Sequence, residues 1–241
     1  MAAVHRIALQ GRVDRFYVCH SSQSFLAPAI ATDDNFATLA EYKPETGRQY
    51  ELGVKYDNGG FSTNLALFDI RKANVDQKDQ TAMTRRLAGE VTLRGVEWSA
   101  TGDLGQGWSL SGNYAYTDAY YRQDADYQGN TLPNVPKHAG SAYLTWGDIA
   151  LAGGTMRIGT GLRYVGRRYI EQNNRLTVPD YTIADAFISW TGHIFFGSET
   201  TIQLNAGNLT DKACIVSIGN QARRLTWGEG RTFRLTARTS L

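Results

Sequence analysis

The sequence predicts an all-β protein, an antiparallel meander of about ten strands that forms the wall of a transmembrane β-barrel. Apolar and polar residues alternate along most of the chain, and no long stretch keeps the period of a helix. Short and long connections alternate between the predicted strands without exception. Aromatic residues gather near strand ends, where a membrane protein meets its two interfaces. Tight turns at one rim and long loops at the other are typical of outer-membrane barrels.

Each predicted strand has an apolar and a polar face, because successive side chains of a strand point to opposite sides. In one segment Tyr50, Leu52 and Val54 share a face opposite Glu51 and Lys55. In the fourth strand the apolar residues change from odd to even positions between Leu93 and Val96. We therefore expect a β-bulge near Gly95, because one extra residue exchanges the two faces of a strand. The predicted strands are residues 12–22, 47–57, 60–72, 84–101, 107–122, 138–147, 155–170, 181–191, 199–212 and 230–241.

The connections distinguish the two rims. The short ones are residues 57–60, which read Asp-Asn-Gly-Gly, and 102–107, 147–154 and 191–198. The long ones are residues 23–46, 73–83, 123–137, 171–180 and 213–229. The last strand therefore ends at the short-turn rim, which is the periplasmic side of an outer-membrane barrel.

Composition excludes several classes of protein. The chain has 241 residues, 25 Lys+Arg against 23 Asp+Glu, and a formal net charge of +2. A charge so near balance argues against a nucleic-acid partner, and 42% hydrophobic residues are too many for a disordered chain. No apolar run approaches the roughly 18 residues that a membrane-spanning helix needs.

A water-soluble β-sandwich also shows alternation and is the main alternative fold. Against it, many predicted strands exceed ten residues, whereas globular strands average about 5–6. The loops also segregate by length, and the aromatic residues near strand ends form a set: Trp98, Trp108, Tyr116, Tyr120, Tyr121, Trp146, Tyr164, Tyr169 and Trp190. A barrel accounts for all three observations.

Catalytic chemistry is not indicated. The two cysteines, Cys19 and Cys214, have no metal-ligand spacing, and they are either free or one optional disulfide. The four His residues have no spacing suited to a metal. The glycines around Gly159 lie inside a predicted strand, so they form no phosphate-binding loop. We expect no enzyme activity and no catalytic, cofactor-binding or metal-binding residue.

Several motifs, in order and at matching separations, resemble the barrel of TonB-dependent outer-membrane siderophore receptors. SSQSFLAP at 21–28 is followed by YKPETGRQYELGVKYD at 42–57, and LRGVEWSATGDLGQGWSLSGNYAYTDA occupies 93–119. LPNVPKHAGSAYLTW at 132–146, NAGNLTDKAC at 205–214 and WGEGRTFRLTARTSL at 227–241 complete the set. The ending is most similar to that of receptors for ferric hydroxamates.

The resemblance implies the C-terminal portion of such a barrel, over residues 12–241, after an irregular leader at 1–11 without a signal peptide. The plug domain and the segment that contacts the inner-membrane energy transducer are expected to be absent. We therefore expect a truncated frame, a gene remnant or a misplaced start. The fragment should be unable to support energised uptake alone.

The function implied is TonB-dependent uptake of ferric siderophores across the outer membrane. The expected partners are a ferric siderophore, outer-membrane lipid and, in intact relatives, the TonB–ExbB–ExbD system; the iron is cargo held by the chelator. Cationic and aromatic residues near the long loops are candidates either for ligand contacts or for contacts with the surrounding lipid, and the sequence assigns none of them to the ligand: Arg167, Arg168, Tyr169, Tyr120, Tyr121, Arg122, Arg223, Arg224 and Trp227. A passive pore or structural barrel and a soluble β-rich binding domain remain alternatives.

Overall fold

The computed structural model describes residues 4–10, 15–26, 43–78, 85–195, 197–218 and 224–240. These residues form strands, turns and loops, and no helix among them is long and apolar enough to cross a bilayer. The prediction of an all-β chain is confirmed.

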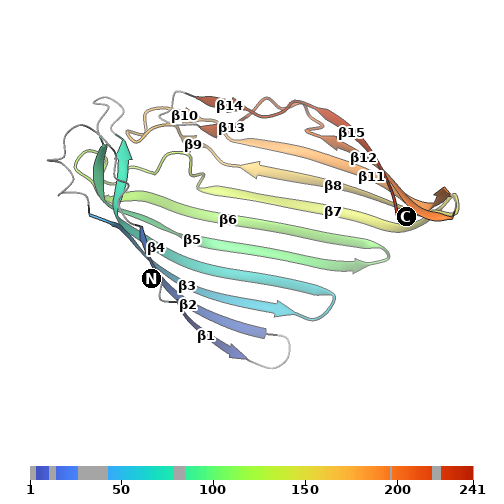
Figure 1. Ribbon diagram of the computed structural model, residues 1–241, viewed down its shortest axis with the longest axis horizontal. Helices are drawn as coiled ribbons and strands as arrows, with labels where there is room; N and C mark the ends of the chain where they lie inside the picture. The colour runs from blue at the N-terminus through green and yellow to red at the C-terminus, as the bar shows by residue number, and fades with distance from the viewer. Residues whose placement is uncertain are drawn as a thin grey trace.

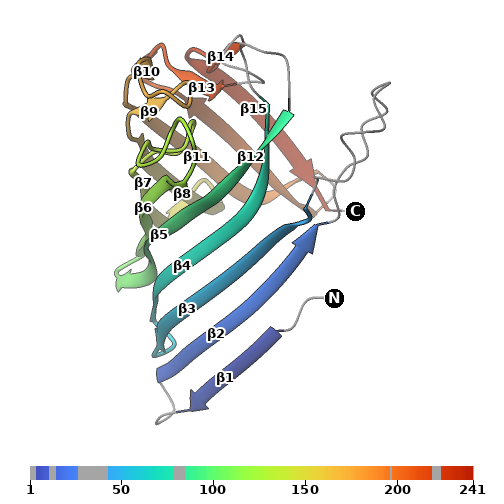
Figure 2. The ribbon, with the colours of Figure 1, turned by 90° about the vertical axis from the view of Figure 1, so that its left-hand side faces the viewer.

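Eleven strands form one antiparallel sheet in which each strand pairs with the next sheet strand along the chain. Figure 1 shows the meander, with tight turns at one end and loops at the other, and Figure 2 shows that the sheet is a single curved layer, open along one side. The strands are β1 (Val4–Gln10), β2 (Arg15–Leu26), β3 (Glu45–Asp57), β4 (Phe61–Lys78), β5 (Arg85–Gly105), β6 (Trp108–Gln123), β7 (His138–Leu151), β8 (Gly154–Val165), β11 (Tyr181–Phe195), β12 (Ser198–Gly207) and β15 (Thr232–Thr239).

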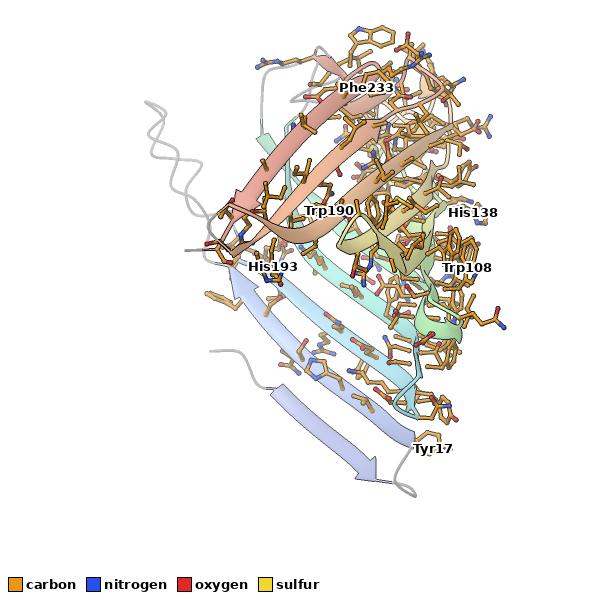
Figure 3. All side chains as sticks on the ribbon, turned by 90° about the vertical axis from the view of Figure 1, so that its right-hand side faces the viewer. Tyr17, Trp108, His138, Trp190, His193 and Phe233 are labelled. Atoms are coloured by element: carbon orange, nitrogen blue, oxygen red, sulfur yellow. The ribbon has the colours of Figure 1, made fainter. Side chains whose placement is uncertain are left out.

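This arrangement contradicts a β-sandwich, because no second layer covers the described sheet. From β3 to β15 the cross-strand register instead joins the apolar faces of the strands into one face of the sheet, which is convex, and the polar faces into the other, which is concave. Figure 3 shows Trp108 and His138 on the convex face. The apolar convex residues include Leu52, Val54, Leu65, Leu67, Val96, Trp98, Leu110, Leu144, Ile158, Leu162, Ile188, Ile202 and Leu204.

The convex face exposes many more large apolar side chains than a surface in contact with water normally does. Leu65 is 43% exposed and Leu52 is 56% exposed, and the apolar residues beside them on neighbouring strands are similarly exposed. A contiguous apolar surface of this extent marks a membrane or protein contact. The concave face carries polar and charged side chains instead: Gln49, Glu51, Lys55, Asn64, Glu97, Ser111, Asn113, Ser141, Arg157, Arg163, Asp185, Gln203, Asn205 and Arg234. An apolar outside and a polar inside are the two faces of a transmembrane barrel wall.

The short turns form as their sequences predict. In the turn between β3 and β4, Asn58 Oδ1 accepts hydrogen bonds from the backbone N–H of Gly60 at 3.1 Å and of Phe61 at 2.7 Å. Gly59 has φ +84°, a left-handed conformation that glycine adopts without steric cost. Within the described residues, the loops after β6, β8 and β12 lie at the opposite rim (Figure 1), as the predicted segregation of short and long connections requires. The segment predicted as a loop at 73–83 instead begins as strand, because β4 continues to Lys78.

The predicted bulge near Gly95 is wrong. The pairing of β5 with β6 is unbroken from Val91 to Asp103, and the bulge lies at Arg122, between the pairs Glu90–Gln123 and Val91–Tyr121. A glycine is needed at position 95 for a different reason, since a Cβ there would lie 2.0 Å from the carbonyl oxygen of Tyr116. The apolar residues change face because the environment of the two faces changes along the strand. Val91 is only 4% exposed on the concave side, where its cross-strand partner Tyr121 is also buried.

Other predicted boundaries also need correction. Residues 4–10 form strand β1, where the sequence predicts an irregular leader, and β1 hydrogen-bonds along β2. The strand predicted at 155–170 ends at Val165, and the one predicted at 199–212 ends at Gly207. Four short strands belong to the outer loops: β9 (Arg168–Tyr169), β10 (Thr177–Val178), β13 (Ile215–Ile218) and β14 (Leu225–Trp227). Hydrophobic periodicity cannot separate these from the sheet, because they are also extended.

Two glycines of β8 occupy the concave face beneath aromatic rings. A Cβ on Gly161 would lie 2.2 Å from the ring of Tyr143, and one on Gly159 would lie 2.4 Å from the ring of Phe187. Each ring belongs to the residue paired with that glycine on a neighbouring strand. The glycines therefore let the aromatic rings of neighbouring strands lie against the wall.

Candidate functional site

The outer loops after β6, β8 and β12 are joined to one another. Asn174 Oδ1 accepts a hydrogen bond from Thr131 N at 2.7 Å, and Asn174 Nδ2 donates to Thr131 O at 2.8 Å. Asn130 Nδ2 also donates to the carbonyl of Gln172 at 2.9 Å. Asn174 has φ +57°, which Asn tolerates better than most residues. The loops after β6 and β8 therefore form one unit at the outer rim.

Arg168 connects this unit to the third loop. Its Nη1 donates to Asn134 Oδ1 at 3.0 Å and to the carbonyl of Val216 at 3.3 Å, and its Nη2 donates to the carbonyl of Ile215. The guanidinium carbon lies 6.0 Å from the centre of the Tyr181 ring. Arg168 is only 5% exposed, so its charge is used inside the protein and is not offered to a ligand.

Loss of Arg168 should loosen the loop unit. Arg168→Met would leave buried carbonyl groups without a donor, and we expect the free energy of unfolding to fall by about 1–3 kcal/mol. Limited proteolysis should then cut the loop of residues 208–231 faster. The exposed neighbour Arg167 provides the control, because Arg167→Met should change neither measurement; equal effects of the two variants would contradict the role of Arg168.

Asn208 holds the two ends of the last outer loop together. Its Nδ2 donates to the carbonyls of Lys212 and Glu229, each at 3.0 Å, and its Oδ1 accepts from Lys212 N at 2.9 Å. Its own backbone N–H donates to Asp185 Oδ1 on the concave face of β11 at 2.8 Å. The motif that follows β12 is therefore a structural junction that positions the loop over the concave face.

A cavity of about 330 Å³ lies between the concave wall and this loop, a volume within the range of small-ligand sites. The cavity is lined from the wall by Arg163, Ile183 and Asp185, and from the loop by Val216 and Trp227 among others. Arg163 Nη2 lies 4.0 Å from Asp185 Oδ2, and Trp227 is 66% exposed. A guanidinium and a free indole face can hold an anionic or aromatic ligand by charge-assisted hydrogen bonds and stacking.

The cationic and aromatic residues that the sequence offers as candidate ligand contacts do not come together at this cavity. Trp227 lines it, whereas Tyr121 is buried and Tyr120 lies on the convex face beneath Arg94, at 5.5 Å. Arg122 is paired with Glu90 at 3.0 Å on the convex side. Arg224 is exposed, and Arg223 lies outside the described residues. Arg163 and Asp185 carry no sequence signal beyond their places on the polar face of a strand.

Metal chemistry finds no support in the described ranges, where no three His, Cys, Asp or Glu side chains come together. Cys19 and Cys214 are both free thiols. His138 lies on the convex face, where its Nδ1 is 2.7 Å from the Tyr114 hydroxyl. Its ring stacks on that of Tyr114 and is tilted by 49° against that of Tyr116, at a centroid distance of 5.3 Å.

Two aromatic groups mark the edges of the apolar convex band. Trp108 and Trp146 stack at 5.5 Å near the short turns, and the cluster of Tyr114, Tyr116 and His138 lies toward the long loops. Beyond that cluster come ion pairs, including Arg94 with Asp118 at 3.1 Å. This order of apolar band, aromatic rings and charges matches the layers of a bilayer.

Comparison with known proteins agrees with this geometry. A family model described as "TonB dependent receptor-like, beta-barrel" matches residues 16–209. The chain belongs to this family. Membership and the lipid-facing sheet place this receptor-family chain in the outer membrane, and the family consists of receptors and transporters.

The relatives of this TonB-dependent receptor chain are considerably longer. The ferrichrome outer membrane transporter/phage receptor of Escherichia coli K12 is 33% identical over 201 residues, which cover 81% of this chain and 26% of the relative. The ferrioxamine B receptor of Salmonella typhimurium LT2 is 28% identical, over 82% of this chain and 28% of the relative. The ferric preacinetobactin receptor BauA of Acinetobacter baumannii superposes with a TM-score of 0.80 at 26% identity, over 97% of this chain and 35% of its own. The chain thus corresponds to a part of their barrel.

Proposed function

We propose that this chain forms part of the wall and outer mouth of a TonB-dependent receptor that takes up ferric siderophores, those of the hydroxamate type above all. The observation that carries the proposal is the concave cavity beneath the last outer loop, lined by Arg163 and Trp227. It lies in a chain whose relatives are named as ferrichrome and ferrioxamine B receptors.

The chemistry of the cavity suits this cargo. A ferric siderophore holds its iron within the chelator, so the protein needs no metal ligands of its own. It needs a surface that recognises the outside of the chelate, which a cation and an exposed indole provide. Asn208 and Arg168 support that surface indirectly, because they hold the loops that carry it.

Energised transport requires more than the described wall. Among the described residues, the sheet has β1 and β15 as its two edge strands, each paired on one side. Unpaired backbone groups at such edges cost several kcal/mol each in lipid, so the wall is complete only when both edges are paired. In the proposed function the TonB–ExbB–ExbD system supplies the energy for release of the ligand, and the wall and loops described above supply binding.

The proposal can be tested with radiolabelled ferrichrome and ferrioxamine B. The protein in outer membranes should bind one of these complexes, and Trp227→Ala should weaken binding about tenfold, since loss of one stacked aromatic ring costs about 1–1.5 kcal/mol. Trp108→Phe, on the convex face, is the matched control and should bind normally. Absence of binding, together with steady conductance in planar bilayers without an energy source, would support a passive pore instead.

A further inference from the structure

Three arginines gather on the convex face just outside the apolar band. Arg48, Arg71 and Arg122 line an open groove of about 390 Å³ together with Thr46, Tyr50, Ala73 and Glu90. The register places this groove on the convex side, because Arg48 shares its face with Leu52 and Arg71 shares its face with Leu67. The groove therefore faces the membrane surroundings and is separate from the concave cavity.

Arg48 and Arg71 are directly opposite each other on neighbouring strands. Two like charges in this position destabilise a sheet unless something neutralises them. Arg71 Nε donates to Asp69 Oδ1 at 2.9 Å, whereas for Arg48 no carboxylate lies in range among the described residues. An anion between the two guanidinium groups would relieve the repulsion.

The third arginine is directed to the groove by a backbone irregularity. Arg122 is the extra residue of the β-bulge between the Glu90–Gln123 and Val91–Tyr121 pairs. A bulge bends a strand and re-aims its side chain. Arg122 Nη1 lies 3.0 Å from Glu90 Oε1, so the groove lining carries three positive charges and one negative charge.

The order of side chains along each strand indicates the source of the anion. Along β3 the convex residues change from Leu52 to Tyr50 to Arg48, and along β4 they change from Leu67 to Asp69 to Arg71. At about 3.3 Å per residue and a strand tilt near 40°, Arg48 lies about 10 Å above Leu52 along the membrane normal. Acyl chains, an interfacial layer and a phosphate follow one another over that distance in a lipid.

We propose that Arg48, Arg71 and Arg122 bind a phosphate group of a phosphorylated outer-leaflet lipid, whose acyl chains lie along Leu52 and Leu67. The planar guanidinium forks of Arg48 and Arg71 match phosphate oxygens in a bidentate manner. The apolar continuation of the same surface favours a membrane lipid over a soluble phosphate.

Binding of defined lipids to the protein tests this site. The protein is extracted from outer membranes in mild detergent and stripped of lipid, and diphosphoryl lipid A is titrated by native mass spectrometry. The double variant Arg48→Gln/Arg71→Gln should lower the affinity at least tenfold, because each lost charge-assisted hydrogen bond is worth roughly a factor of ten or more. Lys55→Gln removes a positive charge from the concave face and should leave the affinity unchanged.

Two further readouts separate binding from folding and lipid from free anion. Without lipid, Arg48→Gln should unfold at the same temperature as the parent or higher, because it removes the repulsion with Arg71. Lower lipid-free stability with unchanged lipid affinity would overturn the proposal. Inorganic phosphate should not displace the lipid at equal concentration; if it binds as tightly as the lipid, the site is one for soluble anions and the lipid assignment is wrong.

Discussion

Leu65→Arg is expected to destabilise the membrane-inserted protein by about 2–4 kcal/mol, the cost of an arginine near the middle of the lipid-facing surface of a barrel. Leu65 lies on β4 within the apolar convex band, between Val54 on β3 and Trp98 on β5. It is 43% exposed, and no protein layer covers it. Water cannot solvate a guanidinium at this depth, and the described neighbours on that face provide no counter-charge.

The next residue provides a stringent control. Asn64 is on the same strand at nearly the same depth, but on the concave face between Lys55 and Ser99. Asn64→Arg should change stability by less than about 1 kcal/mol, because a polar lumen hydrates the new charge. Guanidinium unfolding in phospholipid vesicles, followed by tryptophan fluorescence, measures both variants. Equal effects, or a larger effect at Asn64, would mean that the lipid-facing and lumen-facing sides are assigned the wrong way round.

Asn208→Ala should destabilise the outer mouth by about 2–4 kcal/mol. The substitution removes three side-chain hydrogen bonds, to Lys212 O, Glu229 O and Lys212 N, at a residue only 5% exposed. Each buried group left without a partner costs about 1–3 kcal/mol. Asn208 also has φ +49°, a conformation that costs alanine about 1 kcal/mol more than asparagine or glycine.

Additional variants separate the two causes. Asn208→Gly keeps the backbone freedom but loses the hydrogen bonds, so it should recover only the smaller, conformational part of the loss. Thr210→Ala changes an exposed residue of the same loop and should be neutral. Hydrogen exchange of the amides of Lys212, which donates to Asn208 Oδ1, and Gly228, which donates to the carbonyl of Cys214, reports the two ends of the loop. Protection that is unchanged in Asn208→Ala would show that the loop is held by other contacts.

This second prediction also concerns the ligand. Trp227 and Glu229 line the concave cavity from the loop that Asn208 closes. If the loop loosens, Trp227 and Glu229 are no longer held in the lining of this cavity, and affinity for the proposed ferric siderophore should fall. The effect of Asn208 on binding would thus arise from positioning.

The strands and faces of this protein were predictable because they depend on local patterns. A period of two residues places Leu52 and Leu67 on one face and Glu51 and Asn64 on the other, whatever the neighbouring strands do. The Asp-Asn-Gly-Gly turn at 57–60 sets one rim by its own hydrogen bonds. The number and order of most sheet strands, and the separation of the two rims, follow from these signals.

The alternation of apolar and polar residues predicted the structure wrongly where the environment of a residue depends on distant parts of the chain. Strand β5 extends past Arg94 beyond the apolar band, and there Val91 is buried on the concave side. The apolar residues therefore change from one face to the other along the strand. In the sequence this change looks like a β-bulge, although the pairing is regular there. Arg168 looked like a surface cation because its partners, Asn134 and Val216, are more than 30 residues away along the chain.

Alternation along the chain alone therefore determined an all-β wall with one apolar face, one polar face and two unequal rims. The tertiary structure alone decided which distant residues meet: Arg168 with three loops, Asn208 with both ends of one loop, and Arg48 with Arg71 across two strands. The physical reason is that a strand's faces are a property of its own backbone geometry. Buried hydrogen bonds and charge pairs between strands and loops depend instead on register and loop packing, which only the assembled sheet defines.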